Sequence, residues 1–406
     1  METYKGMQYL KNKLSSKRLR VDKRYRHYEM KHIAKDFNIS TPDDANLRRW
    51  MSILGWCGKA VDSIADRLVF QEFGNDIFDM NDIFRANNMD VLIDSAILGA
   101  LISSCDFIYI TADASGFPQM RVIDGRHATG IIDPITNMLR EGYAVLEYDD
   151  NDNPITEAYF IAGQTDIYEK GRFQYSVKNE APYPLLVPVI YRPDAVRPFG
   201  HSRISRACMS IVDSAARTVK RSEISAEFYS FPQKYVLGMS EDAEQMDTWR
   251  ATMSSFLRID QDENGGHPVV GSFQQQSQTP HADQLRMFAG LFAGETGLTL
   301  DDLGFPSQNP SSSEAIKSSH ETLRLTARKA QRTFGTGLLN AGYLAACVRD
   351  KYPYLRNQVA LTTLKWEPIF EPDASTLSTI GDGVIKINQG IPGYIDEEKI
   401  RDITGM

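Results

Sequence analysis

The chain of 406 residues has few cysteines, and their spacing excludes several kinds of site. No two of them form a CxxC pair. Thiols scattered this widely are typical of buried small apolar residues in a reducing compartment. We therefore expect neither a disulfide framework nor a cysteine-based metal site. The cysteines are Cys57, Cys105, Cys208 and Cys347.

Long uncharged apolar runs are absent as well. The most apolar region, residues 91–110, is interrupted by Asp94, Asp106 and several serines. Because a helix needs about 20 mostly apolar residues to span a bilayer, we expect no transmembrane helix and no membrane partner. The first residues carry no apolar core of a signal peptide, so export by that route is not indicated.

Motifs that position catalytic groups are also missing. The sequence has no GxxxxGK(S/T) phosphate-binding loop, no GxSxG nucleophile turn and no HExxH zinc pair. Residues 260–265 copy the first half of a calcium loop, but the twelfth position is Gly271 instead of glutamate, which favours a plain acidic turn. We expect no catalytic residue, no metal and no cofactor.

Charge is distributed unevenly along the chain. Residues 1–35 hold eleven Lys and Arg against Glu2, Asp22 and Glu29, a net charge of about +8. The formal total is −8, so the remainder carries about −16. A basic arm on an acidic body suits contact with nucleic acid, a membrane surface or an acidic neighbour. A solvated N-terminal helix explains the same charges equally well.

The hydrophobic period changes within the first half of the chain, which indicates an α+β fold. Residues 36–104 show helical spacing, with apolar side chains from Trp50 to Leu68 and again from Val91 to Leu101. Farther on the period approaches two, and turn residues separate short β-rich runs. These runs are residues 143–148, 156–161, 166–169 and 172–175. The pattern predicts an antiparallel meander that ends in the strand 185–191.

Two long helices separated by a compact insert are expected in the middle of the chain. The segment 198–202 stops the sheet and begins a helix, and another helix follows Pro280. The apolar seam of the first helix consists of Ile204, Cys208, Ile211, Ala215, Thr218, Ser222 and Ala226. Residues 231–278 between them combine short strands at 235–237 and 268–270 with a helix. This order predicts a helical hairpin with a small domain at its tip.

The most informative segment runs from Glu295 to Asp350. A polar loop rich in helix-breaking residues comes first, and Ser311 to Ser313 then offer an N-cap. A long helix follows, whose seam is typical of packing against another helix. The seam residues are Ile316, His320, Leu323, Ala327, Ala330 and Phe334, with a second stripe of Arg324, Arg328 and Arg332 beside them.

Three glycines, Gly335, Gly337 and Gly342, interrupt the pattern of this helix. A glycine in mid-helix costs about 1 kcal/mol relative to alanine. Three of them within eight positions therefore predict either a bend or a tight contact.

Several of these segments resemble, in the same order, the portal proteins of siphophage-type tailed bacteriophages. The matching segments are residues 187–193, 199–204, 296–298, 303–305, 309–316 and 390–392. Each match is weak alone, and the resemblance lies in their order across most of residues 40–406. None of the matching segments is as specific as a catalytic motif.

The resemblance implies an α+β, multi-domain portal fold with a wing, a helical stem, a clip and a tunnel loop. Its parts are a basic N-terminal arm (1–35), a wing (36–200), a stem helix (203–230), a clip (231–278), a second stem helix (280–295), a tunnel loop (296–313), a long kinked helix (314–350) and a C-terminal wing segment (351–406). Since the sequence ends at Met406, we expect little or no helical crown.

The resemblance also implies a function and a set of partners. Members form a homo-oligomeric ring, dodecameric in the capsid, at one vertex of the virion. Double-stranded DNA is packaged and ejected through the central channel without sequence specificity. The terminase large subunit docks on the clip, and head–tail connector proteins dock later. Major capsid and scaffold proteins are the other implied partners, and assembly takes place in the host cytoplasm.

Two sets of residues are the candidates for the channel. The tunnel-loop set is polar and uncharged, which suits phosphate contacts that carry no sequence information. It comprises Ser307, Gln308, Asn309, Ser311 and Ser312. The stem set comprises Arg203, Arg206, Arg217, Lys220 and Arg221, for which Asp213, Glu223 and Glu227 are possible partners in neighbouring subunits. We favour ion pairing between subunits over lining of the channel.

Physical reasoning agrees with a ring, because a head-to-tail interface closes when the rotation between subunits is right. We expect the two seamed helices to supply those contacts. Two alternatives stay open: a DNA-processing enzyme such as a nuclease with dispersed carboxylates, and a smaller head–tail adaptor that binds only proteins. The long polar loop before Glu314 argues against the adaptor.

Overall fold

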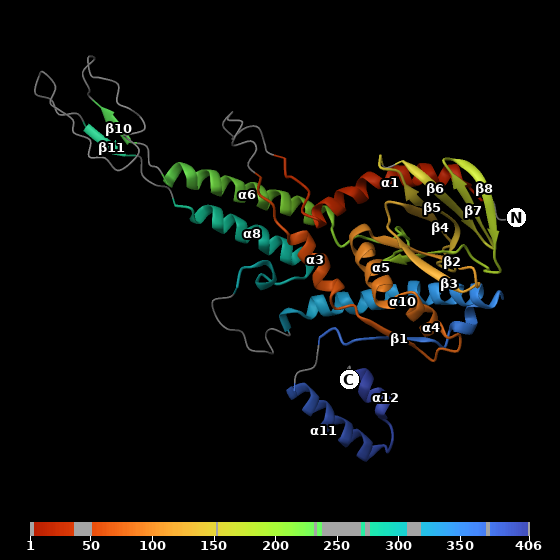
Figure 1. Ribbon diagram of the computed structural model, residues 1–406. Helices are drawn as coiled ribbons and strands as arrows, with labels where there is room; N and C mark the ends of the chain where they lie inside the picture. The colour runs from red at the N-terminus through yellow and green to blue at the C-terminus, as the bar shows by residue number, and fades with distance from the viewer. Residues whose placement is uncertain are drawn as a thin grey trace, which may run out of the picture. The chain divides into compact units, whose positions relative to one another are not determined.

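A computed structural model describes residues 4–35, 51–151, 153–230, 234–237, 269–272, 277–306, 318–370 and 374–404 (Figure 1). The chain divides into two compact units, which we describe separately. Unit 1 comprises Met1–His32, Gly55–Met209 and Ala293–Met406. Unit 2 comprises Ile33–Leu54 and Ser210–Phe292. The architecture mixes helices and strands, as the sequence predicts.

The helices are α1 (Met7–Tyr28), α3 (Trp56–Ala65), α4 (Met80–Ala86), α5 (Met89–Ser103), α6 (Arg206–Ser230), α8 (Thr279–Thr296), α10 (Glu321–Asp350), α11 (Ala374–Gly390) and α12 (Glu397–Thr404). Two short 3-10 turns are η1 (Asp301–Leu303) and η2 (Arg356–Val359). In the described part of the chain, no helix is long and apolar enough to cross a membrane.

The strands are β1 (Phe70–Gly74), β2 (Cys105–Ala112), β3 (Pro118–Ile123), β4 (Ala128–Ile132), β5 (Leu139–Tyr148), β6 (Pro154–Ile161), β7 (Gln164–Glu169), β8 (Arg172–Lys178), β9 (Leu186–Ile190), β10 (Lys234–Leu237), β11 (Val269–Ser272) and β12 (Thr363–Trp366). Strands β4 to β8 form the antiparallel meander that alternation predicts.

The last strand of the expected meander lies elsewhere. β9 pairs with β2 in a separate sheet of order β3-β2-β9. All five of its residues are buried, whereas β8 at the edge of the meander is exposed along its whole length. The prediction that the meander ends in this strand is therefore wrong, because a strand covered on both faces needs a layer on each side.

The expected helical region 36–104 is also revised. Residues 36–50, including Trp50, lie outside the described residues. α3 begins at Trp56, and Ile53 before it is half exposed. β1 then interrupts the helices and pairs with β12, which lies almost 300 residues farther along. Local periodicity could not reveal a strand that pairs with so distant a partner.

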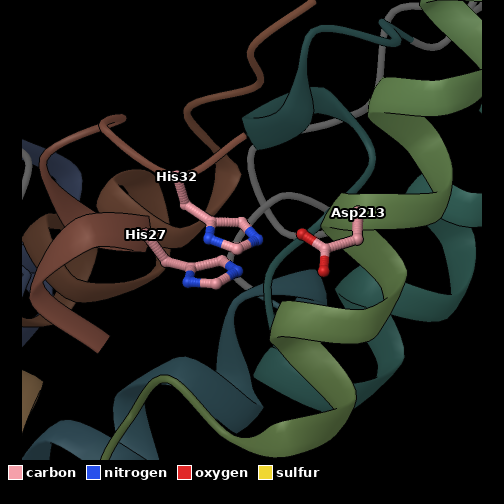
Figure 2. A group of neighbouring side chains, drawn as sticks. All are labelled: His27, His32 and Asp213. Carbon is pink, nitrogen blue, oxygen red and sulfur yellow. The ribbon is translucent and has the colours of Figure 1, made fainter. Parts of the chain in front are cut away.

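The basic N-terminal segment is an integral helix of unit 1. Leu10 and Leu14 of α1 pack against Tyr143, Val145 and Tyr159 of the meander. At its other end, Figure 2 shows the imidazole rings of His27 and His32 face to face, with ring centroids 3.9 Å apart. The basic N-terminal segment is therefore packed against unit 1 and is not a free arm.

The seam of α10 is buried, and the helix as a whole packs against strands as well as helices. Leu323, Ala327, Ala330 and Phe334 are at most 1% exposed, and the helix lies against β9, β2 and β3 as well as α4. The helix-on-helix expectation is thus only part of the packing. Because the seam is used within the subunit, it is not available for the ring contacts that we expected of it.

α10 runs without interruption through its glycines, and Figure 1 shows no sharp bend. A Cβ atom at Gly337 would lie 3.2 Å from the Pro188 carbonyl oxygen and from Val189 Cα. At Gly342 it would lie 2.5 Å from Met80 Sδ. The predicted kink is therefore not observed. The glycines instead mark places where the helix approaches its neighbours closely.

In unit 2, α6 and α8 lie side by side (Figure 1). The Thr218 hydroxyl lies 3.2 Å from Gln284 Oε1, and the Ser222 hydroxyl donates to Gln278 Oε1 at 3.4 Å. The expected tip strands are present as the antiparallel pair β10 and β11. The turn at 260–265 lies outside the described residues.

The C-terminal segment contributes η2 and β12 to unit 1 and ends in two helices, α11 and α12. Asn388 of α11 joins them, because its side chain exchanges two hydrogen bonds with the backbone of Ile395. All four cysteines are buried, as the sequence predicts.

Candidate functional site: the α8–α10 loop base and the β9–α6 junction

The segment between β9 and α6 turns on Gly200. Its φ is +74°, and an added Cβ atom would lie 2.1 Å from the Tyr191 carbonyl oxygen. The next residue uses that same oxygen, since the His201 amide donates to it at 2.9 Å. Only glycine fits both the backbone conformation and the close approach.

After this turn, Ser202 and Arg203 tie the chain to three other elements of unit 1. The Ser202 hydroxyl donates to the Ile102 carbonyl at 2.6 Å. The Arg203 guanidinium donates to the carbonyl of Ala60 in α3 at 3.1 Å and to the carbonyl of Thr296 at the end of α8. Carbonyls at a helix C-terminus favour a cation. Arg203 therefore joins the start of α6 to α3 and to the base of the following loop.

The end of α8 leads into a compact turn. Gly297, with φ +71°, follows the helix and its amide donates to the Ala293 carbonyl at 2.7 Å. The Thr299 amide and hydroxyl both donate to the Asp302 carboxylate at 2.9 Å, which starts η1. Leu303 is buried beneath this turn.

The two ends of the loop between α8 and α10 lie close together. His320 Nε2 lies 3.9 Å from Asp302 Oδ1. A Cβ atom at Gly297 would lie 2.8 Å from Thr322 Cγ2. The residues that flank the segment 307–317, which itself lies outside the described residues, are therefore neighbours in unit 1. We call residues 297–306 and 318–322 the loop base.

A basic face begins at the loop base and follows α10. Arg324 is paired with Glu321 through two hydrogen bonds of 2.7 Å. Arg328, Lys329 and Arg332 are exposed farther along the helix. In the described residues no ion pair joins these three to a carboxylate, so the face is electropositive.

Comparison with known proteins decides which class of protein carries this arrangement. The family model described as phage portal protein, SPP1 Gp6-like, matches residues 7–373. The chain belongs to this family of phage portal proteins.

Two curated relatives agree with this family. The portal protein of Mycobacterium phage L5 is 23% identical over 397 residues, covering 92% of this chain and 80% of that protein. The portal protein of Mycobacterium phage D29 is 22% identical over 401 residues, covering 93% and 81%.

Solved structures with a similar trace come from gene transfer agent particles. A chain from the virion of a native particle has a TM-score of 0.48 at 12% identity, covering 95% of this chain and 99% of that chain. A chain from the neck of a native particle has a TM-score of 0.43 at 15% identity, covering 91% and 95%.

Within this portal protein the predicted stem charges have different environments. Arg203 is 8% exposed and bonded inside unit 1, so our prediction that it faces a channel or a neighbouring subunit is wrong. Burial lowers its pKa below the usual arginine value. Lys220 is only 7% exposed, which leaves little of it for such contacts. Arg206 and Arg221 are exposed, and they remain candidates.

The other predicted charges lie in unit 2. Arg217 is half-buried and donates to the Ser214 hydroxyl at 2.9 Å. Glu223 accepts from the Ser52 hydroxyl at 2.9 Å, and Asp213 is half-buried. The side chain of Glu227 is not among those described. Pairing of these charges between portal subunits therefore stays a prediction.

The tunnel-loop residues Ser307, Gln308, Asn309, Ser311 and Ser312, and Ile316 of the seam, lie outside the described residues. Sequence reasoning missed the tie between Asp302 and His320, because His320 fitted the helical seam. It also missed the burial of Arg203. The serine and glycine before Arg203 indicated a turn. The sequence could not show which backbone carbonyl groups would accept hydrogen bonds from the arginine.

Proposed function

We propose that this portal protein forms a ring-shaped channel at one capsid vertex, through which double-stranded DNA is packaged and later ejected. Membership of the portal family, over residues 7–373, is the observation that carries this proposal. We expect twelve subunits in the particle, as the resemblance implies.

The loop base supports a role for residues 307–317 inside the channel. The described residues on either side of that segment lie close together on unit 1, since His320 Nε2 is 3.9 Å from Asp302 Oδ1 and Gly297 approaches Thr322. The serine, glutamine and asparagine side chains of the segment suit hydrogen bonds to phosphate oxygens, which position DNA without reading its sequence.

The basic face of α10 supports the same proposal electrostatically. Exposed Arg328 and Arg332 begin two to three turns after the loop base. Cations near a polar loop attract the DNA backbone, whereas an uncharged loop lets DNA slide. The formal net charge of −8 for the whole chain limits nonspecific gripping by the rest of the surface.

Ring contacts must come from exposed surfaces of the subunit. The seams of α10 and of the start of α6 are buried, for example at Leu323 and Cys208. Leu323→Asp would therefore disrupt folding of the subunit and is no specific probe of assembly. Exposed Arg206 and Arg221 are better probes, since an ion pair across a head-to-tail interface uses such side chains.

We further propose the partners of the ring. The terminase large subunit docks on the clip, residues 231–278, during packaging, and head–tail connector proteins bind later. Major capsid and scaffold proteins surround the ring in the virion, after assembly in the host cytoplasm. In this function the protein carries out no chemical step of its own.

Negative-stain electron microscopy of the purified protein, together with a native mass measurement, tests the ring. Rings with a central hole and a mass of about twelve subunits are the expected result. A protein that stays monomeric under every assembly condition and is absent from particles would refute the proposal. Metal-dependent DNA cleavage abolished by one acidic substitution would favour the enzyme instead.

Deleting residues 307–310 tests the loop. The deletion starts at Ser307 because Leu303 is buried and its removal would damage the fold. We expect rings of unchanged mass that package or retain less DNA. Replacing the same four residues with Gly-Ser-Gly-Ser keeps the length and isolates the side-chain contribution. Loss of ring assembly in both variants would show that the loop is structural.

A further inference from the structure

A pocket of about 320 Å³ lies inside unit 1 between α1 and the residues that join α5 to β2. The turn before β4 and the loop 197–200 close its other sides. Its lining contains five basic side chains and no carboxylate. They are Lys13, Lys17, Arg20, Arg24 and Arg197.

The inner cations are held by neutral groups only. Arg24 Nη1 donates to the Ser103 carbonyl at 2.5 Å, while its Nε is buried and has no hydrogen-bond partner among the described residues. Lys13 Nζ donates to the Gly130 carbonyl at 2.5 Å and lies 4.5 Å from the centre of the Phe199 ring. Burying a hydrogen-bond donor without a partner is unfavourable, so an additional acceptor beside Arg24 Nε would stabilise the site.

Lys17 and Arg20 lie at the exposed rim, one turn apart along α1. In the described part of the chain, no ion pair joins either of them to a carboxylate. Elsewhere the same helix does find acids, since Lys11 Nζ lies 2.8 Å from Glu157. The lack of acids is therefore a property of this pocket and not of the helix as a whole.

The cations that line the pocket repel one another. Burial, and next Lys17, lower the pKa of Lys13 to about 8. Burial, and after it the charges of Arg20, Arg197 and Arg206, lower the pKa of Arg24 to about 10. Cations gathered at such a position are stabilised by a bound anion, which supplies the missing charge and the missing acceptors.

We propose that this pocket binds a phosphate group. Three oxygens on one anion suit a site with several arginine and lysine donors, and charge-assisted bonds to phosphate are among the strongest in proteins. The pocket volume fits a phosphate or diphosphate group and excludes a folded peptide. The group comes either from a free phosphate compound or from the backbone of a nucleic acid, and the second source rests on the proposed function.

Isothermal titration of the full-length protein with pyrophosphate at constant ionic strength tests the pocket. The test variant is Lys17→Gln/Arg20→Gln, because both side chains are exposed and their loss should leave folding intact. The matched control is Lys23→Gln/Arg26→Gln, which removes the same charge from the same helix but outside the pocket lining.

We expect pyrophosphate affinity to fall about tenfold or more in the test variant, the size expected for losing a charge-assisted hydrogen bond. The control should change it less than about twofold, since screened charges outside the pocket contribute little. Absence of pyrophosphate binding, or an equal loss in both variants, would overturn the proposal.

A short DNA duplex, tested with the same variants, identifies the source of the phosphate. A selective loss of duplex binding in the test variant supports backbone phosphate as the natural occupant. Loss of pyrophosphate binding alone supports a free phosphate compound. Because the pyrophosphate experiment does not depend on rings, a failure of the pocket and a failure of the channel proposal are distinguishable.

Discussion

Gly99, in the middle of α5, is the position where one added methyl group should do most damage. A Cβ atom there would lie 1.7 Å from Asp106 Oδ2. The carboxyl group is buried and cannot swing away freely. Its Oδ1 accepts from the Ser103 hydroxyl at 2.9 Å and from the Gly125 amide at 3.0 Å. Gly99→Ala therefore forces Asp106 out of both hydrogen bonds.

The magnitude follows from two opposing effects. Alanine in place of a helical glycine stabilises by up to about 1 kcal/mol. Losing two buried hydrogen bonds, with an amide left without a partner, destabilises by about 3 kcal/mol. We expect Gly99→Ala to lower the free energy of unfolding of unit 1 by about 2 kcal/mol. In an Asp106→Ala background the obstacle is gone, so the same change should stabilise by up to about 1 kcal/mol.

Urea unfolding followed by tryptophan fluorescence measures this cycle, since Trp56 and Trp366 both belong to unit 1. Gly294→Ala is the control, because an added Cβ atom there meets nothing within 4 Å. A Gly99→Ala protein as stable as the Gly294→Ala protein would refute the reasoning. So would a destabilisation that persists when Asp106 is alanine.

Three further predictions concern unit 1. Arg203→Met removes the donors to the carbonyls of Ala60 and Thr296 and should lower the free energy of unfolding by about 3 kcal/mol in urea titrations, whereas exposed Arg206→Gln should change it by less than about 0.5 kcal/mol. Burial raises the pKa of Asp106, so the unfolded chain ionises first and stability should fall as pH rises above about 4. Asp106→Asn should flatten that dependence in unfolding titrations at pH 4 to 8. Gly337→Val places a branched side chain against the backbone of β9 and should lower the melting temperature by several degrees in calorimetry.

Each of these predictions has a clear contrary result. Equal stability of the Arg203→Met and Arg206→Gln proteins would mean that the buried guanidinium contributes nothing. A pH profile unchanged by Asp106→Asn would show that another group titrates. A melting temperature unaffected by Gly337→Val would show that α10 can move away from β9.

Much of the local structure could be predicted because it depends on residues that are close together in the sequence. Short β-rich runs separated by polar turns such as Lys170-Gly171 predicted the strands β5 to β8. The start of the helix after Gly200, the tip strands β10 and β11, and the buried α10 seam at Leu323 and Phe334 were equally visible. In each case the signal lies within a few residues of the element.

The fold places other elements through partners far away in the chain. β1 exists because β12 pairs with it, and β9 leaves the meander because β2 is available. The glycines of α10 were compatible with a bend or a contact, and only the positions of Pro188 and Met80 decided for contact. Periodicity cannot resolve such choices, since it carries no information about which surfaces meet.

The candidate site shows the same division. By itself, the sequence determined the order of segments, the polar character of the loop 307–312 and a basic N-terminal helix, since composition and spacing are properties of the chain. Only the tertiary structure decided that Arg203 donates hydrogen bonds inside the subunit and that Asp302 and His320 lie close together at the loop base. It also gathered Lys17, Arg20 and Arg24 with Arg197 in one pocket. The role of a charged side chain depends on its burial and on its hydrogen-bond partners, and both are set by tertiary contacts that the sequence pattern does not reveal.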